Sequence, residues 1–274
     1  MTASIRDLLR ADVHDGHFAL PDIHTEPTAG VGKGKTEKET ERDRRRLARR
    51  QERLTAEGTS SMLVVLQGMD TAGKDGTIKH VIRSMNPQAC RITAFKEPTP
   101  QELAHDFLWR IRRALPAHGQ VGVFNRSHYE DVVVVRVNSL VGEDVWRPRF
   151  TKINRFEKKL AAEGTTIVKL FLHISFEEQR RRLLKRLRDP TKRWKFDPAD
   201  LDKRALWDVY QRAYADAIAR CSTDVAPWYV VPADAKWYRN WAIGRLLLET
   251  LDEMNPRYPE PNFDLEALEA RLGR

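Results

Sequence analysis

A glycine-rich stretch between residues 63 and 77 carries the clearest chemical signal in the sequence. Gly68, Gly73 and Lys74 satisfy the pattern G-x-x-x-x-G-K, with an apolar run before them and helix-forming residues after them. In this setting, backbone N–H groups can surround phosphate oxygens, and the lysine adds a positive charge. We therefore favour a phosphate site over a ligand-free strand-to-helix turn, formed by Gly68, Ala72, Gly73, Lys74, Asp75, Gly76 and Thr77.

An aspartate inside this loop is a candidate metal ligand. Asp75 stands where the pattern usually has the Ser or Thr that holds magnesium, so another group must hold the metal. Bound phosphate would repel the carboxylate of Asp70 unless a cation lay between them, and Mg²⁺ prefers carboxylates, phosphate oxygens and water. Asp70 is therefore predicted to bind the metal or to take the acceptor's proton. The alternative is that it only caps the helix or braces the loop.

A second group of charged residues follows another apolar run. That run ends at Asn125, where a P-loop enzyme often has a metal-binding aspartate, and Glu130 and Asp131 come slightly later. Arg126 is placed to neutralise phosphate charge beside them. Taken singly, the two acids would be ordinary residues of a loop or a helix start. Next to a buried strand they become candidates, so the predicted catalytic residues are Asp70, Lys74, Arg126, Glu130 and Asp131. The predicted ligands of Mg²⁺, with Mn²⁺ as a substitute, are Asp70 and Asp131.

Residues 176–196 carry a dense run of basic side chains on a predicted helix and on the loop after it. Leucines form an apolar stripe on this helix, arginines fall on a neighbouring face, and the helix should end before Pro190. Cations in a line suit a polymeric phosphate better than one compact nucleotide, although such a run can also be a solvated face. The predicted phosphate-binding residues here are Arg182, Arg186, Lys192 and Arg193.

Short apolar runs alternate with helical stretches along most of the chain. The predicted strands are 62–67, 92–95, 120–124, 166–172 and 228–232. The predicted helices are about 75–85, 101–114, 150–162, 176–188, 200–221 and 237–253. This alternation predicts an α/β fold with one parallel sheet covered on both faces. No internal repeat or Ser/Gly linker divides the chain, so we expect one domain.

The overall composition narrows the class of protein. The chain has 274 residues, a formal net charge of +9 and a pI near 9.6. This surplus indicates a polyanionic partner: nucleic acid, an acidic membrane surface or a chain of phosphates. No apolar run suits a membrane helix, the start lacks a secretory signal, and Cys90 and Cys221 form neither a disulfide framework nor a metal-ligand spacing. We expect a cytoplasmic protein with no membrane partner.

Five motifs, in order along the chain, resemble a known family. They are "GMDTAGKDG" at 68–76, "NPQ" at 86–88, "ELAHDFLWR" at 102–110, "FNRSHYED" at 124–131 and "RLRDPTKRWKF" at 186–196. Together they are similar to the family-2 polyphosphate kinases, and "GKDG" and "NRSHYED" look like the class III subgroup. On this resemblance Asp70, Gly73 and Lys74 match the Walker A loop. Arg126, Glu130 and Asp131 match the Walker B region, and the basic segment 182–195 matches the lid.

The resemblance implies a P-loop kinase-like three-layer sandwich. It has a five-stranded parallel sheet, helices on both faces and a basic helical lid at about 176–196. It divides the chain into an N-terminal extension at 1–35, a P-loop kinase domain at 36–255 and a C-terminal extension at 256–274. It also implies a homodimer or homotetramer.

The implied activity is that of a magnesium-dependent polyphosphate kinase. Phosphate would pass between inorganic polyphosphate and nucleoside mono- and diphosphates, converting AMP to ADP and ADP to ATP, with guanine nucleotides also accepted. One alternative is an ATP-dependent nucleotide or small-molecule kinase on the same fold. A second is a basic nucleic-acid-binding module, although nucleic acid is not the partner we expect.

Overall fold

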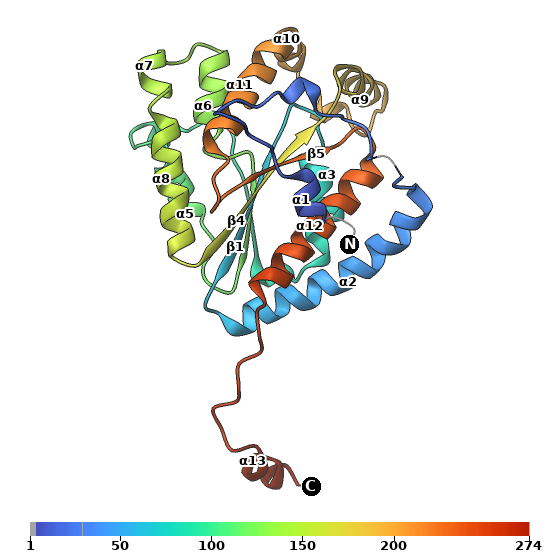
Figure 1. Cartoon of the computed structure of the whole chain (residues 1–274), viewed down its shortest axis with the longest axis vertical. Coiled ribbons are helices and arrows are strands. Elements are labelled where there is room, and N and C mark those ends of the chain that lie inside the picture. The colour runs from blue at the N-terminus through green and yellow to red at the C-terminus, as the bar shows by residue number, and fades with distance from the viewer. Residues whose placement is uncertain (1–3, 29, 274) are drawn as a thin grey trace.

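A five-stranded parallel sheet forms the centre of the computed structural model, which describes residues 4–28 and 30–273 (Figure 1). The strands are β1 (Ser61–Gln67), β2 (Cys90–Ala94), β3 (Val121–Asn125), β4 (Thr165–His173) and β5 (Trp228–Pro232). Their order is β2-β3-β1-β4-β5, and every pairing is parallel. The predicted strands are therefore confirmed, and the central position of β1 places the loop after it in the middle of the sheet edge.

One face of the sheet is covered by helices from both ends of the chain, together with the helix that follows β1. They are α1 (Ile5–Leu9), α2 (Lys33–Glu57), α3 (Lys74–His80) and α12 (Lys236–Met254). From β1, Met62, Val64 and Leu66 point into this layer and are fully buried. The long helices α2 and α12 lie side by side along the sheet (Figure 1).

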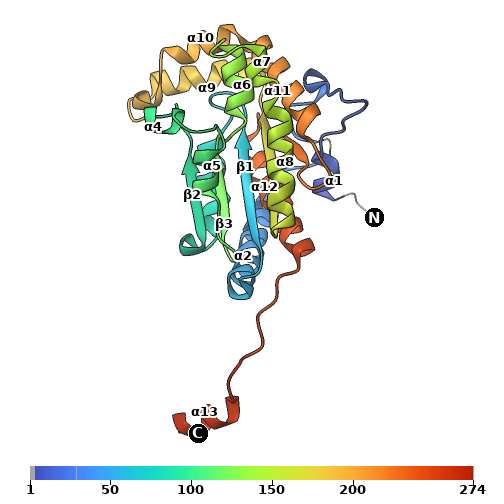
Figure 2. The same cartoon turned by 90° about the vertical axis from the view of Figure 1, so that its left-hand side faces the viewer.

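The opposite face is covered by helices from the middle of the chain. They are α5 (Trp109–Ala114), α6 (Glu130–Val137), α7 (Glu143–Trp146), α8 (Arg149–Ala162) and α11 (Trp207–Cys221) (Figure 2). Leu63 and Val65 of β1 point into this second layer. Because successive strand residues face opposite sides, a continuous apolar strand is what a sheet buried on both faces requires. The predicted three-layer sandwich is confirmed.

Several helices are shorter than predicted. The stretch 75–85 is α3 followed by the 3₁₀ turn η2 (Ile82–Ser84). The stretch 101–114 is α4 (Pro100–Leu103) and α5, separated by a turn in which Asp106 accepts the N–H of Leu108 at 2.9 Å. The stretch 200–221 breaks at Leu206 into α10 (Ala199–Ala205) and α11. The remaining elements are α9 (Phe176–Arg188), α13 (Leu265–Leu272), η1 (Leu20–Asp22), η3 (Pro87–Ala89) and η4 (Arg193–Lys195).

The two ends of the chain differ in how they meet the sheet. At the N-terminal end, α1 packs on α12, and the N–H of Ala11 donates to the carbonyl of Trp228 on β5 at 2.8 Å. At the C-terminal end, the chain after α12 runs away from the body, and α13 lies apart from it (Figures 1 and 2). None of the helices in the described part of the chain is both long and apolar enough to cross a membrane.

A buried ion pair ties the second helical layer to the sheet. The Nζ atom of Lys169 on β4 lies 2.6 Å from Oε2 of Glu157 on α8, and both side chains are almost wholly inaccessible. Lys169 also donates to the hydroxyl of Tyr129 and to the carbonyl of Cys221, and His128 contacts the same glutamate. Burial would raise the pKa of Glu157, but Lys169 and His128 outweigh it and lower that pKa.

We expect Glu157→Gln to destabilise the fold strongly, because it leaves the Lys169 ammonium buried without an acid. Breaking a buried pair in this way costs about 3–5 kcal/mol of unfolding free energy, which urea unfolding would measure. The matched control is Glu163→Gln, which removes the exposed partner of Lys159 and should cost under about 1 kcal/mol. Similar losses in the two variants would contradict the structural role of the buried pair.

Candidate active site

The predicted phosphate loop lies between β1 and α3. Its backbone takes left-handed conformations at Gly68 (φ 144°), Thr71 (φ 69°) and Gly73 (φ 113°). At Gly68 a Cβ atom would lie 2.7 Å from the carbonyl oxygen of Leu172 on β4, so no other residue fits there without a shift of the backbone. The glycine therefore lets the chain turn sharply against the neighbouring strand.

Lys74 is folded over this loop. Its Nζ atom donates to the carbonyl of Gly68 at 2.7 Å and to that of Met69 at 3.3 Å, and the side chain is buried. Burial first, and then the charge of Arg126, lower its pKa to about 8. The loop therefore holds a desolvated cation whose charged form a bound phosphate would stabilise.

Asp70 is surrounded by cations from three separate elements. Its carboxylate lies 2.8 Å from Arg126 and 3.3 Å from Lys203 on α10, and Lys74 acts on it through space. Burial alone would raise its pKa, but these three cations outweigh burial and lower the pKa to about 2. A carboxylate with so low a pKa is a weak proton acceptor. This favours metal binding over the proton-acceptor alternative.

Arg126 connects the loop with the start of α6. It follows β3 in a left-handed conformation (φ 63°), and its N–H donates to the carbonyl of Leu66 on β1. Its guanidinium contacts Asp70 at 2.8 Å and Glu130 at 3.5 Å. Three of the predicted catalytic residues, Asp70, Arg126 and Glu130, thus form one continuous ionic chain beside Lys74.

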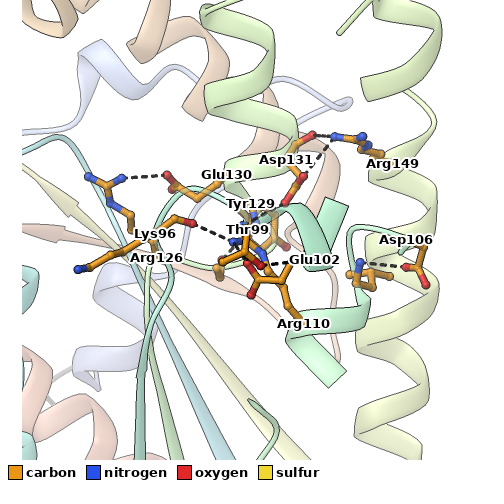
Figure 3. Close-up of polar contacts among 12 residues, drawn as sticks. Lys96, Thr99, Glu102, Asp106, Arg110, Arg126, Tyr129, Glu130, Asp131 and Arg149 are labelled. Carbon is orange, nitrogen blue, oxygen red and sulfur yellow. Dashed lines mark hydrogen bonds and ion pairs between the residues drawn. The ribbon is translucent and has the colours of Figure 1, made fainter. Parts of the chain in front are cut away.

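Asp131 turns to a different set of partners (Figure 3). It lies 3.3 Å from Arg149 on α8 and 3.7 Å from Arg110 on α5, and Arg110 also approaches Glu102 at 3.8 Å. Burial raises the pKa of Asp131 above its usual value, and the charges of Arg149 and Arg110 offset this rise only in part. The contacts of Asp70 and Asp131 do not test whether the two acids hold a metal together, because two carboxylates do not pair with each other, so this stays a prediction. Glu130 is the acid that Arg126 links to Asp70.

Asp75 and Asn125, the two residues that depart from the usual pattern of P-loop enzymes, contact each other. The amide of Asn125 donates to Oδ1 of Asp75 at 2.8 Å, and Lys195 lies 3.6 Å from the other carboxylate oxygen of Asp75. An aspartate at position 125 would place two carboxylates in contact, and like charges repel. The Asp at 75 and the Asn at 125 are therefore a compatible pair, and Asp75 is largely exposed at the rim of the loop.

Arg182 of the predicted lid has a different role from the one predicted. Its Nε donates to Glu178, and its two terminal nitrogens donate to the carbonyls of Thr71, Ala72, Ala233 and Asp234, at 2.6–2.9 Å. The guanidinium is thus used in bracing the phosphate loop against α9 and the end of β5. The prediction that Arg182 binds phosphate directly is therefore corrected, because all five N–H donors of its guanidinium group are already engaged within the protein.

The other predicted lid residues lie farther out. Arg186 approaches Asp200 at 3.6 Å and donates to the carbonyl of Lys195. Lys192 pairs with Asp189, and Arg193 donates to the carbonyl of Leu187 at 2.8 Å. Each of these three cations keeps part of its side chain exposed, so each can still reach a ligand.

Two cations at the loop were missed by the sequence-based predictions. Lys203 reaches Asp70 from α10, and Arg239 of α12 touches the loop at Gly73 and Gly76. Neither belongs to a motif, and only the packing of α10 and α12 brings them to the loop. In the described residues, no group of three or more His, Cys, Asp or Glu side chains could enclose a metal ion. Mg²⁺ ordinarily takes water and phosphate oxygens beside one or two carboxylates.

A phosphate loop after the central strand of a parallel three-layer sandwich, with a buried lysine and an ionised aspartate, defines a phosphotransferase with a P-loop kinase fold. The sequence profile of the family described as Polyphosphate kinase 2 (PPK2) matches residues 30–259. The chain therefore belongs to the polyphosphate kinase 2 family.

Individual relatives agree with this assignment. The chain is 54% identical over 224 residues to the AMP/ADP-polyphosphate phosphotransferase of Meiothermus ruber, covering 82% of this chain and 84% of that protein. It is 43% identical over 227 residues to the ADP-polyphosphate phosphotransferase of Rhodopseudomonas palustris, covering 78% of each. Among solved structures it is similar to polyphosphate kinase 2 from Arthrobacter aurescens TC1. The TM-score is 0.94 at 44% identity, over 98% of this chain and 96% of that one.

Proposed function

We propose that the protein transfers a phosphoryl group between inorganic polyphosphate and nucleoside mono- and diphosphates. The reactions are AMP to ADP and ADP to ATP, with guanine nucleotides as further acceptors and with Mg²⁺ or Mn²⁺ as cofactor. The observation that carries this proposal is the ionic chain Asp70–Arg126–Glu130 beside Lys74 at the phosphate loop. Relatives named for AMP and ADP support the choice of acceptors.

The site fits a divalent cation of the magnesium type. Asp70 is ionised within the loop, and Glu130 is held near it through Arg126. One or two carboxylates plus phosphate oxygens and water are the ligands that Mg²⁺ prefers. Asp70 and Asp131 would hold the ion, with Glu130 next in line as a further carboxylate. When bound, the ion would offset negative charge on the phosphate oxygens.

The protein's own residues supply positioning and charge. Lys74 and the loop N–H groups orient the phosphate to be transferred, and Arg126 lies where it can offset charge on the transferring group. Arg182 and the carbonyls that it binds keep the loop in shape. Arg110 and Arg149, which pair with Asp131 in the first turn of α6, form a separate group of cations. Such a group is suited to the phosphates of a second substrate.

The deciding assay supplies ADP or AMP, polyphosphate and Mg²⁺ with no ATP added. Formation of ATP or ADP is expected. A chain that phosphorylates acceptors only when ATP is supplied would be an ATP-dependent kinase instead. A chain that gives no product and binds nucleic acid with a steep salt dependence would be a binding module.

The pKa of Lys74 predicts how polyphosphate binding responds to pH. Only the ammonium form attracts phosphate, and its pKa in the ligand-free loop is about 8. The Kd for polyphosphate should therefore be steady below that pH and rise by up to about tenfold per pH unit above it. Calorimetry between about pH 7 and 9.5 measures this. Lys74→Arg keeps its charge throughout and should show a flat profile. Identical profiles in both proteins would contradict the assignment.

A further inference from the structure

A segment near the N-terminus passes the carboxyl ends of two strands. It consists of residues 20–28, called the strap below (dark blue in Figure 1). The carbonyl of Ile23 accepts a hydrogen bond from Nε2 of His173, the last residue of β4, at 3.1 Å. The hydroxyl of Thr28 lies 2.5 Å from that of Tyr238 on α12. The strap is thus held at the same edge of the sheet that carries the phosphate loop.

Between these two contacts, the strap meets a carboxylate that also holds the start of α9, the helix of the predicted lid. Asp234, two residues after the end of β5, is 8% exposed. Its Oδ2 atom accepts the hydroxyl of Thr25 at 2.9 Å, and its Oδ1 atom accepts the N–H of Ser175, the N-cap of α9, at 2.8 Å. The N–H of Asp234 also donates to the carbonyl of Thr25 at 3.2 Å. Each carboxylate oxygen therefore binds a different segment of the chain.

The backbone of Asp234 is joined in turn to the phosphate loop. One terminal nitrogen of Arg182 donates to the carbonyls of Ala233 and Asp234, and the other donates to those of Thr71 and Ala72 in the loop. Arg182, like Asp234, is 8% exposed. The path from the strap to the loop therefore runs through two buried side chains, and water does not compete freely for their hydrogen bonds.

The hydroxyl of Thr25 matters on this path because Asp234 is an acceptor with a charge to satisfy. A buried acceptor that loses its donor pays the cost of desolvation, and it turns toward other donors to reduce that cost. If Asp234 turns, the start of α9 and Arg182 lose the position that it gives them. Phosphoryl transfer depends on the placement of the reacting groups, and a shift of about 1 Å can lower a rate about a hundredfold.

We propose that the strap positions the phosphate loop and the start of α9 for phosphoryl transfer, with Thr25 and Asp234 as positioning residues. This inference rests on the proposed function, because the geometry concerned is that of the transfer site. Neither residue needs to touch substrate: Thr25 acts through Asp234, and Asp234 acts through Ser175 and Arg182. The strap precedes the part of the chain that the family profile matches, which begins at residue 30, so this role does not follow from membership of the family.

Two substitutions at Thr25 separate the hydrogen bond from packing. Thr25→Val keeps the shape of the side chain and loses the hydroxyl, whereas Thr25→Ser keeps the hydroxyl and loses a methyl group. With ADP and polyphosphate, kcat should fall by about tenfold in Thr25→Val and stay within about twofold of wild type in Thr25→Ser. KM should change little, because the substrates still bind to a misplaced site. A wild-type kcat in Thr25→Val would overturn the proposal.

The matched control is Thr55→Val, which removes a hydrogen bond at the opposite edge of the sheet. The hydroxyl of Thr55 on α2 donates to the carbonyl of Gly119, just before β3, at 2.9 Å. Thr25→Val and Thr55→Val each lose one hydroxyl donor, so a general loss of stability would act on both. We expect Thr55→Val to keep the wild-type kcat. A fall in kcat as large as that of Thr25→Val would refute a specific role of the strap.

A pair of variants tests the carboxylate. Asp234→Asn can keep both contacts, because its oxygen accepts the N–H of Ser175 and its amide donates to the oxygen of Thr25. Asp234→Ala keeps neither contact. We expect kcat to stay within about threefold of wild type in Asp234→Asn and to fall by about a hundredfold in Asp234→Ala. Equal losses in the two variants would mean that the charge of Asp234 acts on the site, and the positioning role would be wrong.

Hydrogen exchange in the ligand-free protein distinguishes failure of this proposal from failure of the proposed function. Exchange in the first turn of α9 and in the loop 68–73 should be about tenfold faster in Thr25→Val than in wild type, whether or not the chain transfers phosphate. Thr55→Val should exchange there as the wild type does. Equal exchange in the two variants refutes the link between the strap and the site, while leaving the transfer activity intact.

Discussion

Replacing Lys74 by alanine should lower kcat/KM for transfer from polyphosphate by about two to three orders of magnitude, the typical cost of removing one preorganised charge-stabilising donor. Lys74 is the cation that lies over the carbonyls of Gly68 and Met69, at the place where the loop would hold the transferring phosphate. The fold should persist. Burial lowers the pKa of this lysine in the folded protein, so its charged form is disfavoured by folding.

The comparison that isolates this effect is Lys79→Ala, because Lys79 is an exposed lysine on the same helix. Initial rates with ADP and polyphosphate, together with thermal unfolding of both variants, measure the difference. We expect Lys79→Ala to retain wild-type rates. Full activity in Lys74→Ala would defeat the assignment of the phosphate loop.

The second large effect is expected for Asp70→Asn, which preserves the size of the side chain and removes its charge. Asp70 is the ionised group that meets Arg126 and Lys203 at the loop. We expect turnover to fall by about a hundredfold and the Mg²⁺ concentration for half-maximal activity to rise by at least roughly tenfold. Titration of activity with Mg²⁺ provides both quantities.

Asp202→Asn is the matched control, because Asp202 is exposed and lies next to Lys203 on α10. Its Mg²⁺ titration should overlay that of the wild type. If Asp70→Asn loses turnover but keeps the wild-type Mg²⁺ response, the carboxylate braces the loop through its two cations and does not hold the metal.

The sheet and the phosphate loop could be predicted because their signals are local. Each strand is a short apolar run, and the glycine and lysine spacing of the loop lies within seven residues. Helix breaks were harder to predict, since Leu206 is an ordinary helix former. The break there follows from packing: α10 turns its Lys203 toward Asp70, whereas α11 lies on the sheet.

The candidate site was predicted only in part, because the partners of several of its side chains depend on packing and not on local sequence alone. Spacing placed Arg182 on a basic face of α9, yet the acid at the i−4 position, Glu178, already indicated a bonded side chain. Glu130 and Asp131 are adjacent in sequence but point to different partners, because neighbouring helix positions face different directions. Arg239 had no local signal, since its contact with Gly73 depends on how α12 packs beside α3.

A structure of the chain with polyphosphate bound tests the central claim most directly. Density for the polymer should begin at the loop between Gly68 and Thr77, within contact of Lys74. Polyphosphate bound elsewhere on the basic surface, with the loop free of phosphate, would contradict the account.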